Sequence, residues 1–416
     1  MKQFLSAILI CVVTACNAQT VQNSLVIIGK TDSVNSKILN EKRKVWVHVP
    51  NAMNDPAYTK TRYPVVYLLD GEGHFPSVAG MIQQLSEVNG NTICPEMIIV
   101  AIPNTDRTRD LTPSNASIGP DGKHNDGFKS SGGGEKFTAF LEKELIPHID
   151  SLYPTAPYRV LIGHSFGGLT VMNIVVNHTN LFNAYVAIDP SMWWDSKKLL
   201  NQAHEVMQQK KFEGKSLFLA IANTMPAGMD TLQVRKDTIG NTGHIRSILE
   251  LSDVLKNSTA SGLNWSYKYY KNDNHGSVPL IAEYDALHFL FSYYPFPQEV
   301  ASKMFDPKAK IDIAAAINSH YVDVSKHMGY KTLPPEAQIN EMGYFYLQSQ
   351  APEKAYTLFN MNIQNYPGSF NVFDSMGDYY SAQKDKVKAI EFFNKALKLK
   401  ENPETREKLT KLQASK

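Results

Sequence analysis

A short apolar segment, a sharp glycine-flanked turn and a helix follow one another in the middle of the chain, and the turn contains a serine. Residues 158–162 predict a buried strand, Gly163-His164-Ser165-Phe166-Gly167 forms the turn, and the apolar residues after it predict a helix. A turn this tight holds the serine in a strained conformation and leaves room only for glycine two positions to either side. The serine hydroxyl then projects at the start of the helix, where backbone N–H groups can stabilise a developing oxyanion. The pattern predicts that Ser165 is a nucleophile.

Continuous apolar runs separated by helical patterns predict the scaffold around this turn. A run such as residues 63–69 is typical of a strand buried on both faces of a sheet. Strands that alternate with helices predict an α/β fold with a mostly parallel sheet and helices on both faces. We expect strands at residues 24–29, 43–49, 63–69, 97–102, 158–162, 183–188, 216–222 and 265–270.

A long polar loop is expected at residues 104–134. A loop of this length within a compact domain is usually either functional or disordered. It ends in Gly132-Gly133-Gly134, which lacks the Lys-Ser/Thr pair of a phosphate-binding loop. We interpret the three glycines as a flexible segment before the next helix.

Charge and motif content exclude several classes of partner. The chain has 42 Lys and Arg against 40 Asp and Glu, a net charge of +2, and no dense basic block. Neither nucleic acid nor an anionic membrane surface is therefore indicated. There is no His-Glu-x-x-His pattern and no glycine fingerprint for a dinucleotide, so we expect no metal and no cofactor.

The first 20 residues predict an export signal, because Lys2 precedes an apolar run over residues 4–13 that small residues follow. Val13-Thr14-Ala15-Cys16 resembles a bacterial lipobox, which would leave a lipid on Cys16, and we favour it. Ordinary cleavage after Ala18 is the alternative. Either way we expect export, to the periplasm or to a lipid-anchored position on the cell envelope. Cys94 is then left without a partner cysteine, and we expect it to be buried.

The composition changes after about residue 297, and residues 335–416 contain a repeat of 34 residues. Small and aromatic residues at such offsets are typical of tetratricopeptide helix pairs, in which the small residues lie where two helices touch. Two pairs bury little alone, so we expect them to pack on a helix at residues 309–326 or on the larger domain. A structural appendage and a surface for a protein partner both fit the pattern. The repeated positions are Gly343 and Gly377, Tyr346 and Tyr380, Ala355 and Ala389, and Phe359 and Phe393.

The serine needs a base and a carboxylate that holds the base in the correct tautomer. Where a serine occupies this kind of turn, the acid and then the histidine follow it on loops after later strands. His275 directly follows the last expected strand, which makes it the expected base. His244 falls on a helical pattern, and His164, inside the turn, is expected to point away from the position of the base.

The acid is expected after the strand at residues 216–222, where Asp230 and Asp237 are the candidates. We favour Asp230 because it is nearer to the end of the strand. A Ser–His dyad without a carboxylate is the alternative. The oxyanion hole needs two backbone N–H groups, one from Phe166 and the other from the loop after residues 63–69, at Gly71 or Glu72.

Several separated motifs resemble the putative-esterase family, which includes siderophore esterases, esterase D, feruloyl esterases and the antigen 85 acyltransferases. The resemblance covers roughly residues 25–295. It implies the α/β-hydrolase fold, Ser165 as nucleophile, His275 as base and backbone donors at Glu72 and Phe166, with Arg107 and Trp194 in the substrate cleft. The motifs are Tyr67-Leu68-Leu69-Asp70-Gly71, residues 102–110, Gly163-His164-Ser165-Phe166-Gly167-Gly168, Asp189-Pro190-Ser191-Met192-Trp193-Trp194 and His275-Gly276-Ser277.

These observations predict a serine carboxylic-ester hydrolase that acts on a small-molecule or carbohydrate ester, such as a siderophore ester or an acylated carbohydrate. An acyltransferase of the same fold is the nearest rival, and a catalytically silent domain that serves as a scaffold is another. The expected organisation is a signal at 1–18, an esterase domain at 19–296, a helical linker at 297–334 and tetratricopeptide-like repeats at 335–416, the last available to a protein partner.

Overall fold

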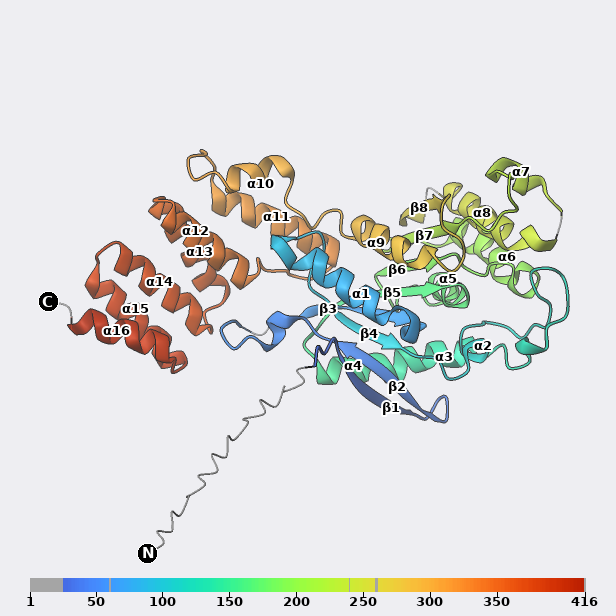
Figure 1. Cartoon of the computed structure of the whole chain (residues 1–416), viewed down its shortest axis with the longest axis horizontal. Coiled ribbons are helices and arrows are strands. Elements are labelled where there is room, and N and C mark those ends of the chain that lie inside the picture. The colour runs from blue at the N-terminus through green and yellow to red at the C-terminus, as the bar shows by residue number, and fades with distance from the viewer. Residues whose placement is uncertain (1–24, 60, 239, 259–260, 415–416) are drawn as a thin grey trace, which may run out of the picture.

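The computed structural model describes residues 25–59, 61–238, 240–258 and 261–414. Its centre is an eight-stranded sheet with the order β1-β2-β4-β3-β5-β6-β7-β8 (Figure 1). β2 pairs antiparallel with β1 and β4, and every other neighbouring pair is parallel. This is the α/β-hydrolase fold, as expected. The strands are β1 (Lys30–Ser36), β2 (Glu41–His48), β3 (Tyr63–Leu69), β4 (Ile98–Ile102), β5 (Thr155–His164), β6 (Ala184–Ile188), β7 (Ser216–Ala222) and β8 (Asn264–Tyr270).

The central strands are mostly apolar, so both faces of the sheet are covered by helices. All seven residues of β3 are buried. Val65 and Tyr67 join the core on one face, whereas Val66 and Leu68 join the core on the other. The helices of this part are α1 (Gly71–Ser86), α2 (Arg107–Asp110), α3 (Gly134–Phe140), α4 (Ile146–Leu152), α5 (Phe166–Asn177), α6 (Trp194–Gln209), α7 (Thr231–Lys236), α8 (Gly243–Lys256) and α9 (Val278–Leu290).

The first strand lies later in the chain than expected. Residues 25–29 form no regular structure, and Leu25, Val26 and Ile27 are exposed. β1 instead takes the polar segment 30–36, which pairs with β2 at the edge of the sheet. An edge strand buries few side chains, so it lacks the apolar run on which the prediction relied. The predicted signal segment and Cys16 fall within residues 1–24, outside the described residues.

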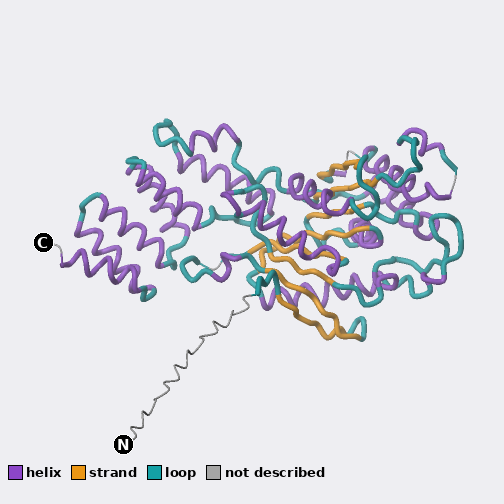
Figure 2. Tube along the Cα trace, viewed as in Figure 1, coloured by secondary structure: helices purple, strands orange, loops and turns teal. Residues whose placement is uncertain are grey.

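The segment at 104–134 is largely loop (Figure 2), and hydrogen bonds and close packing hold its glycine end in place. Gly133 and Gly134 donate their N–H groups to the carbonyl oxygens of Arg109 and Thr112, at 2.9 and 3.0 Å. A β-carbon at Gly132, Gly133 or Gly134 would lie 2.7–2.8 Å from atoms of residues 109–115. We therefore correct the interpretation of the three glycines: they allow close backbone approach.

Residues 298–414 form a helical tail, which lies to the left of the sheet in Figure 1. The repeat of 34 residues appears as two similar helix contacts: a β-carbon at Gly343 would lie 2.5 Å from the Phe359 ring, and one at Gly377 would lie 2.5 Å from the Phe393 ring. The assignment to the tetratricopeptide class stays a prediction. The helices are α10 (Gln298–Met304), α11 (Ile313–Met328), α12 (Glu336–Gln348), α13 (Pro352–Asn365), α14 (Phe370–Ala382), α15 (Lys386–Leu399) and α16 (Pro403–Ala414).

The helical tail shares a core with the sheet. The core on the α1 and α9 face continues through Tyr321 of α11 to Tyr346 of α12 and Phe359 of α13. Buried Glu336 accepts hydrogen bonds from the Thr59 N–H at 2.9 Å and the Ser369 hydroxyl at 2.6 Å. In the described part of the chain, no helix is both long and apolar enough to span a membrane.

We predict that Gly377→Ala destabilises the helical tail by about 1–3 kcal/mol, because the new methyl group would be forced into the ring of Phe393. Urea unfolding measures the loss. Gly80→Ala is the matched control, since its position in α1 is open space and alanine favours a helix there. Equal stability of both variants would contradict the packing argument.

A cavity of about 410 Å³ lies where the start of β3 meets the segment before α12, and Glu96 lines it together with Tyr63 and Tyr366. Burial, reinforced by the negative charge of Glu87, raises the pKa of Glu96 to about 7. Between the ordinary glutamate pKa of 4.5 and 7, the folded chain therefore retains a proton that the unfolded chain has lost. The free energy of unfolding must fall as the pH rises through this window.

Glu96→Gln should remove this loss. We expect the variant to be more stable than the wild type by about 1–2 kcal/mol near pH 8, a value reduced for the partial exposure of the side chain, and equally stable near pH 4. Denaturant unfolding at both pH values measures the difference. Glu205→Gln, at an exposed position in α6, is the control and should change stability at neither pH.

Candidate active site

Ser165 lies between β5 and α5 in the strained turn that the sequence predicts. Its φ and ψ are 61° and −113°, outside the regions that L-residues prefer. A β-carbon at Gly163 would lie 2.4 Å from the Gly167 carbonyl group, so no larger residue fits there. The Ser165 hydroxyl lies 3.4 Å from the hydroxyl of buried Ser191. Strain of this kind persists only where the surrounding structure enforces it.

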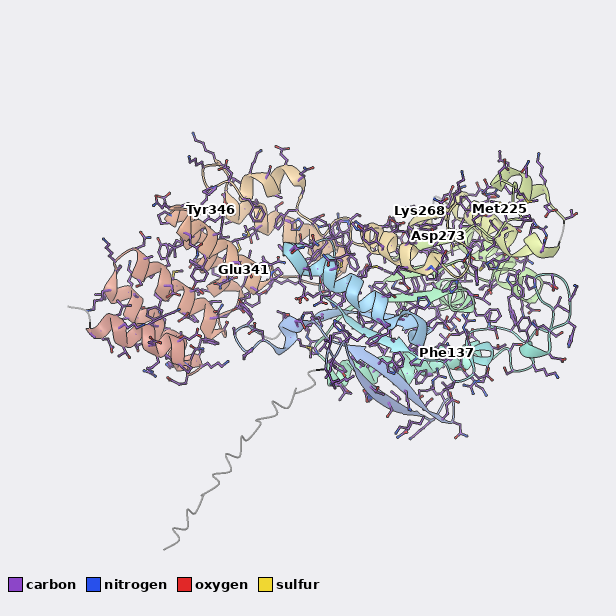
Figure 3. All side chains as sticks on the ribbon, in the orientation of Figure 1. Phe137, Met225, Lys268, Asp273, Glu341 and Tyr346 are labelled. Carbon is purple, nitrogen blue, oxygen red and sulfur yellow. The ribbon has the colours of Figure 1, made fainter. Side chains whose placement is uncertain are left out.

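His275 follows β8, as expected, and the loop that carries it lies against the loop after β7. The Asn223 N–H donates to the Asp273 carbonyl at 2.8 Å, and the Asn223 side chain donates to the Lys271 carbonyl at 2.9 Å. Figure 3 labels Met225 and Asp273 in these two loops. The sequence predicts the catalytic acid after β7. In the structure, the residue directly after β7 instead holds the loop that carries His275.

The carboxylate that faces His275 is Asp189, directly after β6. Nδ1 of His275 donates to Oδ2 of Asp189 at 2.6 Å, which leaves Nε2 of the imidazole as the basic nitrogen. Asp189 is fully buried. Burial alone would raise the pKa of Asp189, but hydrogen bonds from His244 and His275 outweigh it and lower the pKa. Asp189 is therefore ionised at neutral pH and can stabilise a protonated His275.

The assignment of Asp230 is therefore corrected. Asp230 is exposed and caps α7, because its side chain accepts from the N–H groups of Leu232 and Gln233 at 2.8 Å. Asp237, the other candidate, accepts from the Thr242 hydroxyl at 2.6 Å. A signal for Asp189 was present: it directly follows a buried strand that neighbours β5, in the motif that continues to Trp194.

His164 also differs from expectation, since its ring lies beside that of His275 with centroids 4.4 Å apart. Burial, followed by the nearby His275 and His74, lowers the pKa of His164 to about 4. His164 is therefore neutral, and its buried Nε2 has no hydrogen-bond partner among the described residues. It forms an apolar wall beside His275 and does not compete as the base.

Asp189, His244 and His275 are the one group of donors in the described residues that could hold a metal ion. His244 Nε2 lies 2.8 Å from the carboxylate oxygen that also binds His275. Both separations are hydrogen-bond distances between donor and acceptor, so the group is accounted for without a metal.

The expected oxyanion donors lie at the first turns of two helices, where backbone N–H groups have no acceptor within the helix. Phe166 begins α5, and Gly71 and Glu72 begin α1. The Glu72 side chain points to Asn104, whose side-chain nitrogen lies 2.9 Å from a carboxylate oxygen. Buried Gly71 packs against β4, since a β-carbon there would lie 2.7 Å from the Ile102 nitrogen. These contacts hold the α1 turn next to the end of β4.

Arg107 ties the two turns together. It donates to both carboxylate oxygens of Asp70, at 2.6 and 2.9 Å, and to the His164 carbonyl at 3.2 Å. Asp70 precedes the α1 turn in the left-handed conformation, with φ of 53°. Burial would raise the pKa of Asp70, but the Arg107 ion pair outweighs it and lowers the pKa. Arg107, expected in the substrate cleft, is thus mainly engaged by the protein.

Comparison with known proteins identifies the family of the chain. Residues 36–230 match the family described as Putative esterase. A crystal structure of an IroE-like serine hydrolase from Shewanella oneidensis is 31% identical, with a TM-score of 0.68 over 81% of this chain and 99% of that one. The chain belongs to the putative-esterase family. It is a carboxylic-ester hydrolase, and residues 25–295 carry the motifs of that family.

Two curated relatives of the esterase are also similar. A ferri-bacillibactin esterase of Bacillus subtilis is 25% identical over 272 residues, which are 62% of this chain and 87% of that protein. A siderophore triacetylfusarinine C esterase of Aspergillus fumigatus is 28% identical over 205 residues, which are 46% of this chain and 66% of that protein.

An aromatic cluster adjoins Ser165 of the esterase, and it changes the role expected of Trp194. Trp194 is 1% exposed and donates its indole N–H to the Ser114 carbonyl at 3.0 Å, so it anchors the long loop. Trp193 is partly exposed, and its ring lies 6.2 Å from those of Phe166 and Phe128. The tryptophan available to a substrate is therefore Trp193, which the sequence motif did not distinguish from its neighbour.

We predict that Asp189→Asn lowers kcat by about 10³- to 10⁴-fold, because the amide cannot hold the productive tautomer of His275 or balance its charge. Asp230→Asn is the matched control: asparagine caps a helix as well as aspartate, so both stability and kcat should stay near those of the wild type. Ester hydrolysis with a chromogenic acetate measures both variants. A large loss of kcat in Asp230→Asn alone would restore the original assignment.

Proposed function

We propose that the protein is a serine esterase in which Ser165 attacks the acyl carbonyl of the substrate. His275 takes the proton from the Ser165 hydroxyl through Nε2, and Asp189 stabilises the imidazolium that forms. The N–H groups of Phe166 and Glu72 stabilise the oxyanion. Loss of the alcohol, which receives the proton from His275, leaves an acyl-enzyme that water hydrolyses. The short bond between His275 and buried Asp189, at the sheet edge that also bears strained Ser165, is the observation that carries this proposal.

A siderophore ester is the substrate class that we favour over an acylated carbohydrate. Both curated relatives act on siderophores according to their names. The aromatic face formed by Trp193, Phe128 and Phe166 suits a planar or apolar group on the acyl side of such an ester. Arg107 and Glu72, the charged side chains expected in the cleft, already contact other residues of the protein.

We propose that the esterase is exported, with residues 1–18 as its signal and Cys16 as the point of lipid attachment if the lipobox is used. The helical tail would then be a tetratricopeptide-like module that a protein partner can contact. Mass spectrometry of the mature N-terminus from bacterial cells tests the first part, since a lipidated Cys16 and a free N-terminus at Gln19 differ in mass and in solubility.

We expect a fluorophosphonate probe to label the wild type, and we expect Ser165→Ala to abolish both labelling and ester hydrolysis. Peptide mapping should place the label on Ser165. The substrate panel consists of ferric and metal-free siderophore lactones, a linear siderophore ester and an acetylated oligosaccharide. Hydrolysis that survives in Ser165→Ala would overturn the mechanism, whereas turnover of the oligosaccharide alone would overturn the substrate class.

The same assays separate the two rival functions. An acyltransferase would form a new ester when a second alcohol is added and would hydrolyse little in its absence, because both reactions pass through one acyl-enzyme. A silent scaffold would react with neither probe nor substrate. The position of the contact between His275 and Asp189, at the sheet edge that also bears strained Ser165, supports the esterase over the scaffold.

A further inference from the structure

We propose that His244 is a positioning residue of the active site, which holds the Asp189 carboxylate in the orientation that His275 requires. The inference rests on the proposed function, because it assigns a role within that catalytic group. Asp189 has two histidine partners instead of one. Nε2 of His244 lies 2.8 Å from Oδ2 of Asp189, and Nδ1 of His275 lies 2.6 Å from the same oxygen.

The hydrogen bonds around Asp189 give His244 this role. Oδ1 accepts from the Ala222 N–H at 2.9 Å, so the end of β7 fixes one oxygen. Oδ2 has two lone-pair directions, and the two histidines fill both. An oxygen that carries two donors cannot swing away from His275 without breaking both bonds. If His244 is removed, a buried charged oxygen keeps a single donor and gains freedom to rotate.

The contact also fixes the protonation of His244. A carboxylate that has lost its proton only accepts hydrogen bonds, so Nε2 of His244 must carry the hydrogen. The second donor draws charge from Oδ2 and weakens the attraction of Asp189 for the proton on His275. The other titratable groups that face this region are His164, beside His275, and His74 and Asp70 beyond it. None of these three residues lies on α8, so we expect a substitution of His244 to leave their positions unchanged.

The fold holds His244 by means of the long loop and the turn before α8. A β-carbon at Gly243 would lie 2.8 Å from the Pro120 carbonyl oxygen, and one at Gly240 would lie 2.9 Å from that of Asp121. The tip of the long loop therefore packs directly against the turn that precedes His244. Asp237 supports the same turn through the hydroxyl of buried Thr242. The side chain of His244 is 14% exposed and has little room to move.

The test compares three substitutions in the full chain. His244→Gln places an amide N–H near the position of Nε2 and should keep the contact. His244→Asn is too short to reach Asp189, and His244→Phe keeps the ring without a donor. We expect kcat to fall about 10- to 100-fold in the Asn and Phe variants, with KM little changed and near-complete recovery in the Gln variant, as for a lost hydrogen bond to a charged group.

The pH profile distinguishes positioning from a merely structural role. With one donor removed, Asp189 attracts the His275 proton more strongly, so the acidic limb of kcat/KM should move to higher pH in the Asn and Phe variants. The low-field proton resonance of the His275–Asp189 bond should shift in the same two variants. An unshifted resonance would overturn the proposal, as would an unchanged kcat and pH profile in both variants or a Gln variant as impaired as the Phe variant.

A matched control exists elsewhere in the chain. His148 Nε2 lies 2.8 Å from Asp32 Oδ2, which is the same kind of contact between α4 and β1, remote from Ser165. His148→Asn should leave kcat and the pH profile unchanged. The resonance does not depend on turnover of an ester, so it keeps the two hypotheses separate. An inactive wild type would refute the proposed esterase mechanism. An unshifted resonance in His244→Asn would refute the role of His244.

Discussion

A buried carboxylate must be compensated by hydrogen bonds, or it takes up a proton and loses its charge. Removing such a group from water costs several kcal/mol, and at Asp189 three N–H donors offset that cost. The donors come from β7, from α8 and from the loop after β8, so the ionised state exists only when these elements are assembled. The residues next to Asp189 in the sequence cannot by themselves keep its carboxylate ionised. The charge that stabilises a protonated His275 is therefore a property of the folded sheet edge.

The parallel register explains why these groups meet. Ile188 at the end of β6 pairs with Ala220 of β7, and Ala222 of β7 pairs with Tyr270 at the end of β8. The residues after each strand thus emerge at one edge, where β5 delivers Ser165. Arg107 adds a second tie at this edge, between Asp70 and the His164 carbonyl. Arg107 joins the turn before α1 to the turn before α5, so the two turns in which we propose the oxyanion donors are held together.

The parts of the site that depend on adjacent residues were predictable from sequence, and the parts that depend on distant contacts were not. Ser165 needs only its glycines and flanking strand and helix, and His275 needs only to follow the last strand. Asp230 and Asp189 both follow strands, so their positions in the sequence do not distinguish them. Asp230 caps α7, and its distance from β7 along the chain does not reveal this. Trp193 and Trp194 have the same side chain, and only the packing of the loop at Ser114 determines which one is buried. Likewise, the three glycines at 132–134 suggested a flexible segment from sequence, whereas the structure packs them closely against residues 109–115.

The tail contacts the esterase domain at the end of the sheet opposite the active site. Its anchor, Glu336, binds the segment before β3, whereas Asp70 and the α1 turn follow β3. A strand of this length separates the two by roughly 23 Å at about 3.3 Å per residue. The tail therefore cannot touch a substrate at Ser165 through that contact. The tail is connected to the active-site end of the sheet through the shared core, because the buried face of α1 packs into the same core as α11 to α13. A shared core of this kind favours a supporting role for the helices next to the sheet.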